Sequence, residues 1–215
     1  MEIDHIFIFS NQGGVEANDL IDFGFTEGSN RRHHGQGTIN RKFYFDNFFL
    51  EILWVIDEEE INNTTTAVTK LWERSQFQNN TYSRFGLCLV NTAVTDSLFE
   101  DSRTYSPAYF PRGMSINMIV NENNPQLPCT FRLPYRGRKN NHNEPIKHKN
   151  GIKTLTRAEF EIPEYSIKNS FIKNFDEFDH IKYTSSNRIH LTLEFDHNHK
   201  GKKKTFETLN LTLKY

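Results

Sequence analysis

A carboxylate in the middle of an apolar strand constrains this chain more than any other feature of its sequence. Residues 42–45 and 48–55 have the patterns of two strands, and Asp46-Asn47 between them predicts the turn of a β-hairpin. Glu51 then lies within a half-buried strand. Because an unpaired buried charge is costly, Glu51 must meet a cation, a metal or hydrogen-bond donors.

A second unusual strand begins the chain. Residues 3–9 (IDHIFIF) predict a strand that carries His5 among apolar side chains. His5 and Glu51 are therefore two candidate metal ligands or acid–base groups in one N-terminal segment. The alternative is a core histidine whose ring nitrogens are satisfied by Glu51 or by the backbone.

The loop between these strands is rich in glycine and hydrogen-bonding groups. Gly35 and Gly37 would let the backbone approach a ligand closely. Side-chain contacts to a ligand are expected from His34, Gln36, Thr38, Asn40 and Arg41, with Trp54 as an apolar wall. Arg41 suits a carboxylate or phosphate. The alternative is a loop whose hydrogen bonds only fix the following strand.

Composition excludes several classes of function. A formal net charge of −1 provides no global field for nucleic acid or an anionic membrane. No apolar run approaches the roughly 20 residues of a membrane span. The two cysteines form no disulfide framework, and the N-terminus has no signal-peptide pattern, so we expect a soluble, cytoplasmic protein. Phosphate-loop, dinucleotide and serine-nucleophile motifs are all missing from the sequence.

The chain is expected to form a single domain, 1–215, of two modules and a connection. The first module, 1–57, contains a helix over 15–23 that Gly24 ends. The connecting insertion, 58–154, is β-rich, with a short helix near residues 68–72 and a basic surface loop over 136–149. The second module, 155–215, has these expected elements: a strand at 155–162, a helix at 166–175, and strands at 179–185, 188–196 and 205–215.

The C-terminal strands divide sharply into an apolar and a polar face. The polar face carries Arg157, Glu159, His190, Glu194 and Asn210. It is either the water-facing side of an antiparallel sheet or the wall of a cavity shared with His5 and Glu51. We expect the second arrangement, with all these groups converging on one pocket.

The order of these features resembles the glyoxalase-like branch of the vicinal oxygen chelate superfamily. The resemblance rests on Asp4-His5 in the first strand, a helix, the loop over 34–41, and the strand with Leu50-Glu51-Ile52-Leu53. It implies an α+β fold in which paired βαβββ modules form a curved mixed-sheet cup, with a β-rich connecting insertion.

The resemblance also implies a divalent metal (Zn, Ni, Fe or Mn) held by the first and last strands of each module. His5 and Glu51 are the first-module ligands. The second module would offer Arg157 (or Ala158) and Asn210, which are unsuited to a transition metal, so the tetrad is broken. His190, Glu194 or His148 could replace the missing ligands.

Two functions remain open from the sequence. The first is a lyase- or isomerase-type enzyme on a small polar carbonyl or hydroxy-acid substrate. Glu51 would be its base or ligand, His5 its ligand or acid, and Arg41 its anion anchor. The second is a non-catalytic protein that sequesters a small molecule, as antibiotic-binding relatives do. Such relatives often dimerise, so a homodimer is compatible with both.

Overall fold

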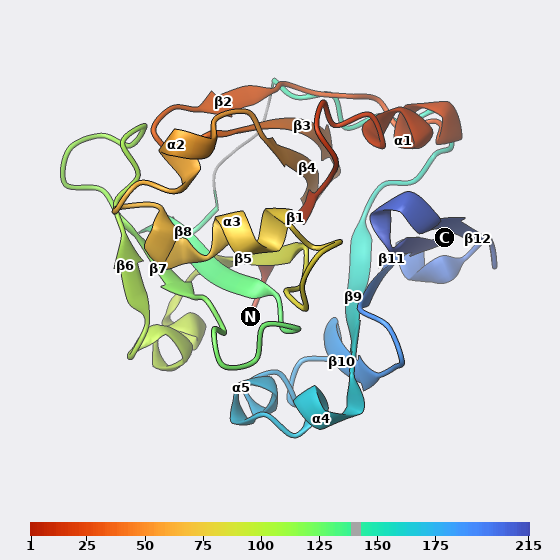
Figure 1. The fold of residues 1–215 in the computed structure, drawn as a ribbon. Coiled ribbons are helices and arrows are strands. Elements are labelled where there is room, and N and C mark those ends of the chain that lie inside the picture. Colours follow the sequence, from red (N-terminus) through yellow and green to blue (C-terminus); the bar gives the residue numbers. More distant parts are fainter. Residues whose placement is uncertain (139–142) are drawn as a thin grey trace.

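The computed structural model describes residues 1–138 and 143–215, and it contains two β-sheets (Figure 1). The larger sheet is a strongly curled, mixed sheet of eight strands in the order β2-β3-β4-β1-β5-β8-β7-β6. Its strands are β1 (Ile3–Phe9), β2 (Arg31–His33), β3 (Thr38–Tyr44), β4 (Phe49–Val55), β5 (Phe85–Asn91), β6 (Arg103–Tyr105), β7 (Ile116–Ile119) and β8 (Cys129–Arg136). The expected α+β fold with a curved mixed sheet is confirmed.

Two βαβββ halves build this curled sheet. In the first half, β1 is followed by α1 (Ala17–Phe23), ended by Gly24 as expected, and then by β2, β3 and β4, with β4 parallel to β1. In the second half, β5 is followed by two 3-10 turns, η2 (Ala93–Thr95) and η3 (Ser97–Phe99), and then by β6, β7 and β8. β8 is parallel to β5, and antiparallel pairing of β1 with β5 joins the halves.

The expected position of the second module is therefore wrong. The partner of the first half comes from residues 85–137, within the segment assigned to a connecting insertion, and not from 155–215. This half could not be predicted from the sequence pattern, because two short 3-10 turns replace the helix and because β6 and β7 have only three and four residues. Such short elements carry almost no periodicity.

Residues 155–215 form a separate sheet of five strands in the order β10-β9-β11-β13-β12, drawn in cyan and blue in Figure 1. Its strands are β9 (Leu155–Ile162), β10 (Ile181–Ser185), β11 (His190–Phe195), β12 (Lys203–Phe206) and β13 (Leu211–Lys214). The helix expected over 166–175 is instead two single turns, α4 (Glu164–Ile167) and α5 (Ser170–Lys173). The last expected strand is broken by a turn, η5 (Glu207–Leu209), after which Asn210 has a positive φ of 50°.

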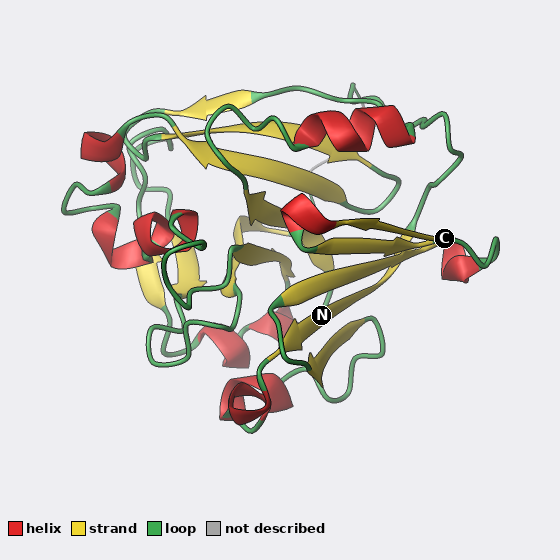
Figure 2. Cartoon of the chain, turned by 45° about the vertical axis from the view of Figure 1, so that its right-hand side comes forward, coloured by secondary structure: helices red, strands yellow, loops and turns green. Residues whose placement is uncertain are grey.

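The main core lies between the two sheets, which Figure 2 shows from a second direction. Ile6 and Ile8 of β1 and Leu87 of β5 belong to the same buried cluster as Leu191 and Leu193 of β11. The outer face of the curled sheet is thus covered by the apolar face of the five-stranded sheet. Burial of both apolar faces provides the main stabilisation of this arrangement.

A β-bulge in β1 changes the alternation that the sequence predicts. Ile3 pairs with Leu89 and His5 with Cys88, so the register shifts at Asp4. Ile3 belongs to the outer core, whereas His5 and Phe7 line the inner face, although strict alternation along residues 3–9 would place all three on one face. A bulge re-aims neighbouring side chains, and here it turns both Asp4 and His5 toward the inside of the sheet.

Three of the remaining helical segments connect β4 to β5 along the chain: α2 (Glu58–Ile61), η1 (Ala67–Thr69) and α3 (Leu71–Ser75). The short helix expected near 68–72 corresponds to η1 and α3. The last segment, η4 (Asp196–Asn198), connects β11 to β12. Over residues 1–138 and 143–215, no helix is long and apolar enough to cross a membrane.

The basic loop expected over 136–149 is only partly described, because residues 139–142 lie outside the described part of the chain. Arg136 is the last residue of β8, and Arg138 forms an ion pair with Glu2 at 2.9 Å. His148 is buried, and both of its ring nitrogens have partners. This part of the segment is therefore fixed to the first half of the sheet.

Candidate functional site

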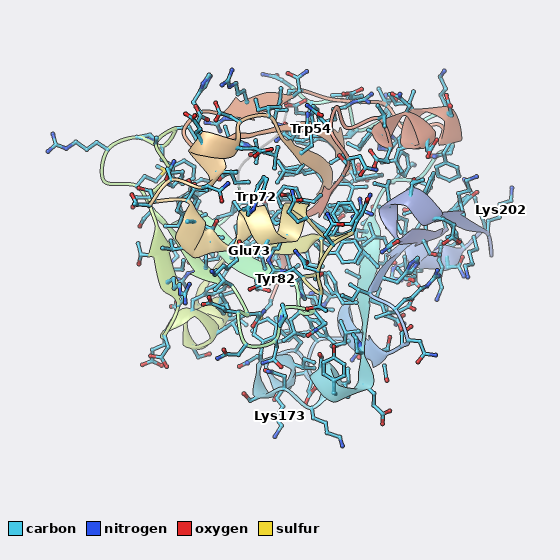
Figure 3. The ribbon with its side chains drawn as sticks, viewed as in Figure 1. Trp54, Trp72, Glu73, Tyr82, Lys173 and Lys202 are labelled. Atoms are coloured by element: carbon cyan, nitrogen blue, oxygen red, sulfur yellow. The ribbon has the colours of Figure 1, made fainter. Side chains whose placement is uncertain are left out.

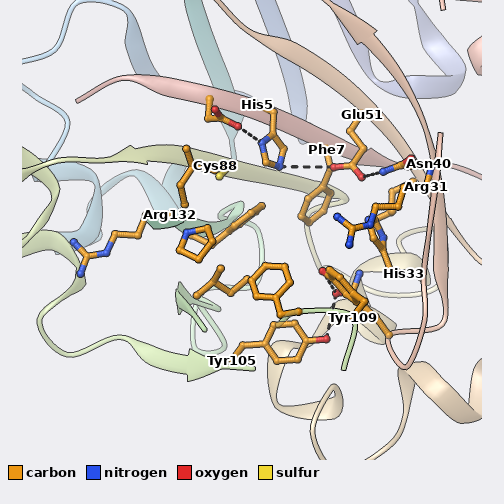
Figure 4. Close-up of a pocket in the computed structure, with 18 of the residues that line it drawn as sticks. His5, Phe7, Arg31, His33, Asn40, Glu51, Cys88, Tyr105, Tyr109 and Arg132 are labelled. Atoms are coloured by element: carbon orange, nitrogen blue, oxygen red, sulfur yellow. Dashed lines mark hydrogen bonds and ion pairs between the residues drawn. The ribbon is translucent and has the colours of Figure 1, made fainter. Parts of the chain in front are cut away.

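The inside of the curled sheet encloses a cavity of about 530 Å³ (Figure 4). Much of its wall is aromatic or aliphatic, and a group of polar side chains lies on β1, β3 and β4. Main apolar lining residues are Phe7, Phe49, Leu53, Leu71, Tyr105, Tyr109, Phe110, Met114, Ile116, Met118 and Phe131. This volume and this mixture of surfaces are typical of a small-molecule site.

His5 occupies the polar part of the cavity with a fixed orientation. Its Nδ1 lies 2.7 Å from Asp4 Oδ2, and its ring stacks on Phe49 with centroids 4.3 Å apart. Phe131 approaches the ring edge-on at 5.4 Å. With Nδ1 donating to Asp4, the His5 Nε2 atom is the nitrogen that faces the cavity.

Glu51 faces His5 from the adjacent parallel strand. Its side chain is buried, at 6 % exposure, and its Oε1 accepts a hydrogen bond from Asn40 Nδ2. Its Oε2 lies 3.7 Å from His5 Nε2, as the dashed lines in Figure 4 mark. The sequence prediction that His5 and Glu51 lie together is confirmed. Their separation exceeds hydrogen-bonding distance, so these two atoms are not bonded directly to each other.

A second histidine, His33, also lines the cavity, and the sequence analysis missed it. His33 Nδ1 lies 2.9 Å from Thr38 Oγ1, and its ring lies 4.9 Å from that of Tyr109. Burial lowers the pKa of His33 from its ordinary 6.5 to about 4, although the Glu51 carboxylate opposes this shift. His33 is therefore neutral at physiological pH. The predicted neighbour, His34, is exposed and does not line the cavity.

Gln36 connects the two halves of the sheet across the cavity. Its Oε1 accepts hydrogen bonds from the hydroxyls of Tyr105 and Tyr109, both at 3.2 Å, and its Nε2 donates to Thr38 at 2.8 Å. Gln36 and Asn40 line the cavity as predicted. Thr38 is buried and does not line it, but its hydroxyl contacts both Gln36 and His33.

The glycine loop is closed by a side chain of the protein itself. Glu60 Oε2 accepts the backbone amides of Gly35 at 2.8 Å and Gly37 at 3.0 Å. Gly37 also has a φ of +76°, and a Cβ there would lie 2.2 Å from the carbonyl oxygen of Asp57. Gly37 is thus needed for close packing with 57–60, whereas a Cβ on Gly35 would meet Ala108. The amides of both glycines are bound to Glu60 and do not face a ligand. The backbone of the loop therefore fixes the start of β3, while the Gln36 side chain lines the cavity.

Arg41 and Trp54 do not contribute to the cavity, which corrects two predictions. Arg41 lies on the outer face of β3, where it binds Glu27 through Nε at 2.7 Å and NH2 at 2.6 Å. Trp54 lies on the outer face of β4 against Gly14. The period of two explains both errors: Asn40 and Lys42 face inward, so Arg41 between them faces outward, as Trp54 does after Leu53.

The predicted convergence with the C-terminal strands is wrong. Arg157, His190 and Asn210 belong to the five-stranded sheet, and none lines the cavity. Arg157 is exposed, His190 Nε2 lies 2.9 Å from Thr212 Oγ1, and Asn210 donates to the carbonyl of Ile189. Glu159 and Glu194 likewise bind threonines within this sheet. The apolar face of this sheet is used to cover the curled sheet, so its polar face points away from the cavity.

The donors around His5 do not complete a metal site. The inward positions of the second half are Cys88 and Phe131, and burial raises the pKa of the Cys88 thiol well above its ordinary range. Asp4, His5 and Cys88 lie close together, but Asp4 is already bonded to the nearest ring nitrogen. Among residues 1–138 and 143–215, this leaves His5 Nε2 and Glu51 Oε2 as the donors best placed for a metal. Zinc sites usually use three or four protein ligands. His148, one suggested replacement, lies elsewhere with both nitrogens bonded.

Comparison with known proteins identifies a shared fold and no established function. No family model matches the chain, and no curated protein matches it either. A hypothetical protein from Staphylococcus aureus is similar over 99 % of this chain and 98 % of its own, with a TM-score of 0.58 and 12 % sequence identity. A hypothetical protein from Bacillus halodurans aligns over 65 % of this chain and 98 % of its own, with 11 % identity and a TM-score of 0.41. The first similarity shows that the two-sheet architecture occurs in another protein.

Proposed function

We propose that this protein is an enzyme of the glyoxalase-like branch of the vicinal oxygen chelate superfamily. It would catalyse proton transfer on a small carbonyl or hydroxy-acid substrate, as a lyase or isomerase. The observation that carries this proposal is the facing pair of His5 Nε2 and Glu51 Oε2 at the polar part of a ligand-sized cavity.

The two groups are arranged for opposite roles in one reaction. Asn40 occupies one Glu51 oxygen and leaves Oε2 to accept a proton from substrate carbon or oxygen. Asp4 accepts the Nδ1–H of His5 and holds Nε2 toward the same space. There the imidazolium form of His5 can donate the Nε2 proton to the substrate, and the neutral form can take a proton back. A substrate atom that faces the pair from the cavity could lie within hydrogen-bonding distance of both Nε2 and Oε2, because these two atoms are only 3.7 Å apart.

The surrounding wall favours a substrate with an apolar part beside its reacting end. Aromatic side chains line the space beside His5 and Glu51, so a substrate that fills this space would displace water from the two groups. Exclusion of water strengthens the electrostatic interactions of the reacting groups. Phe49 and Phe131 also restrict rotation of the His5 ring.

A divalent metal of the superfamily type (Zn, Ni, Fe or Mn) would be held by His5 and Glu51 with solvent or substrate as further ligands. The proposed proton transfer does not depend on it, since the side chains present provide both proton acceptor and proton donor. Metal analysis of the purified protein, compared with His5→Gln, decides whether these side chains hold a metal.

Sequestration of a small molecule is the second candidate, favoured by Cys88 and Phe131 at positions where the superfamily's metal-dependent enzymes would need ligands. In both cases the partner is a small molecule, and a homodimer is compatible with either. We propose a cytoplasmic location, since both cysteines are free and buried, which suits a reducing compartment.

Incubation with a panel of small carbonyl and hydroxy-acid compounds, followed by mass spectrometry, separates the two functions. We expect product from at least one compound, and loss of that product in Glu51→Gln. Glu194→Gln, a carboxylate in the other sheet, is the matched control and should leave turnover unchanged. Stoichiometric binding without any product would support sequestration and contradict the enzyme proposal.

A further inference from the structure

Two positively charged side chains on one wall of the cavity lack an acidic partner. Lys42 of β3 and Arg31 of β2 both line it, and among residues 1–138 and 143–215 no carboxylate lies within ion-pair distance of either. The Lys42 ammonium lies 5.5 Å from the centre of the Tyr44 ring, and the Arg31 guanidinium lies 4.9 Å from that of Tyr109. Figure 4 shows Arg31 beside Asn40 and His33.

Other basic side chains near the sheet have partners: several form ion pairs with acids, and the buried Arg74 and Arg84 donate to backbone carbonyl oxygens. Arg132, also at the cavity, lies 2.7 Å from Asp96, Arg41 lies 2.6 Å from Glu27, and Arg138 lies 2.9 Å from Glu2. Lys42 is instead partly buried, and its desolvation is opposed only by more distant carboxylates, Glu51 and Glu144. Both of these acids already have hydrogen-bond partners, Asn40 for Glu51 and Ser29 for Glu144.

A partly buried cation with neither an acidic group nor a carbonyl oxygen as partner is unfavourable, and the negative charge of a ligand would stabilise it. Lys42 and Arg31 come from adjacent strands, since Arg31 pairs with Asn40 in the β2–β3 register. Asn40 and Lys42 share the inner face of β3, so the ammonium and the Asn40–Glu51 pair border the same space. Arg31 is exposed and Lys42 is half-buried, so Arg31 lies nearer to solvent than Lys42 does.

We propose that Lys42 and Arg31 bind the anionic group, a carboxylate or a phosphate, of the small molecule that enters the cavity. The apolar part of that molecule lies against the aromatic wall, and its reacting end reaches His5 and Glu51. This assignment of a ligand class rests on the proposed function for its reacting end, whereas the anion site itself depends only on Lys42 and Arg31. It replaces Arg41, whose guanidinium faces away from the cavity.

The test is a calorimetric titration of the purified protein with phenylacetate, phenyl phosphate and phenylacetamide. The three probes share a ring, but only the first two carry negative charge. We expect at least one anion to bind about 10-fold more tightly than the amide, because hydrogen bonds to charged groups are stronger than neutral ones. The better of the two anions identifies the source as carboxylate or phosphate.

Variants then locate the anion site. Lys42→Met removes the charge but retains most of the unbranched side chain, and it should reduce anion affinity about 10-fold while leaving amide affinity unchanged. Arg31→Gln, at an exposed position, should act in the same direction and remains informative if Lys42→Met folds poorly. Lys202→Gln is the matched control, because Lys202 projects from the other sheet (Figure 3).

Equal binding of anions and amide, unchanged anion binding in both variants, or no binding of either anion at millimolar concentration would overturn the proposal. Titration of Glu51→Gln separates this result from the proposed catalysis. Retained anion preference in that variant means that the anion site stands whether or not Glu51 acts as a base.

Discussion

His5 Nε2 and Glu51 Oε2 face each other across 3.7 Å, from neighbouring parallel strands of the curled sheet. Each group is oriented by a different partner: Asp4 binds the other nitrogen of His5, and Asn40 binds the other oxygen of Glu51. The two unoccupied atoms therefore point into the same part of the cavity. Four side chains on three strands determine this arrangement.

Asp4 is expected to act as a positioning residue through His5. Asp4→Asn retains the size of the side chain but no longer fixes the proton of the His5 ring on Nδ1. The ring therefore adopts the other neutral tautomer, with the proton on Nε2, more often. We expect turnover to fall by about 10- to 100-fold, as for other residues that orient a functional histidine. The pH profile of kcat/KM should also shift, which a merely structural role would not cause. An unchanged profile and rate would show that Asp4 does not orient His5.

Arg74 should be essential for stability although it is far from the proposed chemistry. It is fully buried at 0 % exposure, and its guanidinium donates to the carbonyl oxygens of Ser83, Leu127 and Val120. Arg74→Ala would leave these three acceptors unpaired, so we expect a loss of about 3–5 kcal/mol in the free energy of unfolding.

Urea denaturation of Arg74→Ala measures this loss. Arg103→Ala is the control, since the Arg103–Glu122 ion pair is exposed and its loss should change stability by less than about 1 kcal/mol. Equal effects of the two substitutions would contradict the structural role of Arg74.

Stability should fall when the pH is lowered from 6.5 to 4, partly because of His33. The pKa of His33 is lowered from 6.5 to about 4 by burial, so the unfolded chain takes up the proton first. Between pH 6.5 and 4, protons therefore bind to His33 more strongly in the unfolded chain than in the folded protein. The free energy of unfolding accordingly rises with increasing pH. For His33 the effect is at most about 3 kcal/mol. Thermal denaturation between pH 4 and 7 should show a smaller pH dependence for His33→Gln than for the original protein. An identical slope would refute the assignment.

The first half of the curled sheet was predictable because its residues combine clear periodicity with strong end signals. In the strand of His5, the helix ended by Gly24 and the hairpin of Glu51, several residues favour the same secondary structure. The order of these elements then predicted that His5 and Glu51 lie close together. The second half was not predictable from its short strands and 3-10 turns, which depend on pairing with β5 rather than on local pattern.

Errors in the site arose where one residue changes a face. The bulge at Asp4 cannot be read from a period of two, so Asp4 was not assigned to the cavity. Arg41 was assigned to an anion because of its chemistry, and Lys42 was not considered, although the positions of these two residues in β3 decide which one faces inward. The polar C-terminal face was correctly recognised as a face, but its direction depends on packing between sheets, which no strand pattern contains.

Incorporation of deuterium from D₂O is the most direct measurement of the central claim, proton transfer by His5 and Glu51. The protein is incubated with a panel of small 2-oxo and 2-hydroxy acids in D₂O, and the carbon-bound deuterium is followed by NMR. We expect exchange at the carbon next to the carbonyl or hydroxyl of at least one compound, with about a 100- to 10,000-fold lower rate in Glu51→Gln. Exchange at the original rate in Glu51→Gln would contradict the account.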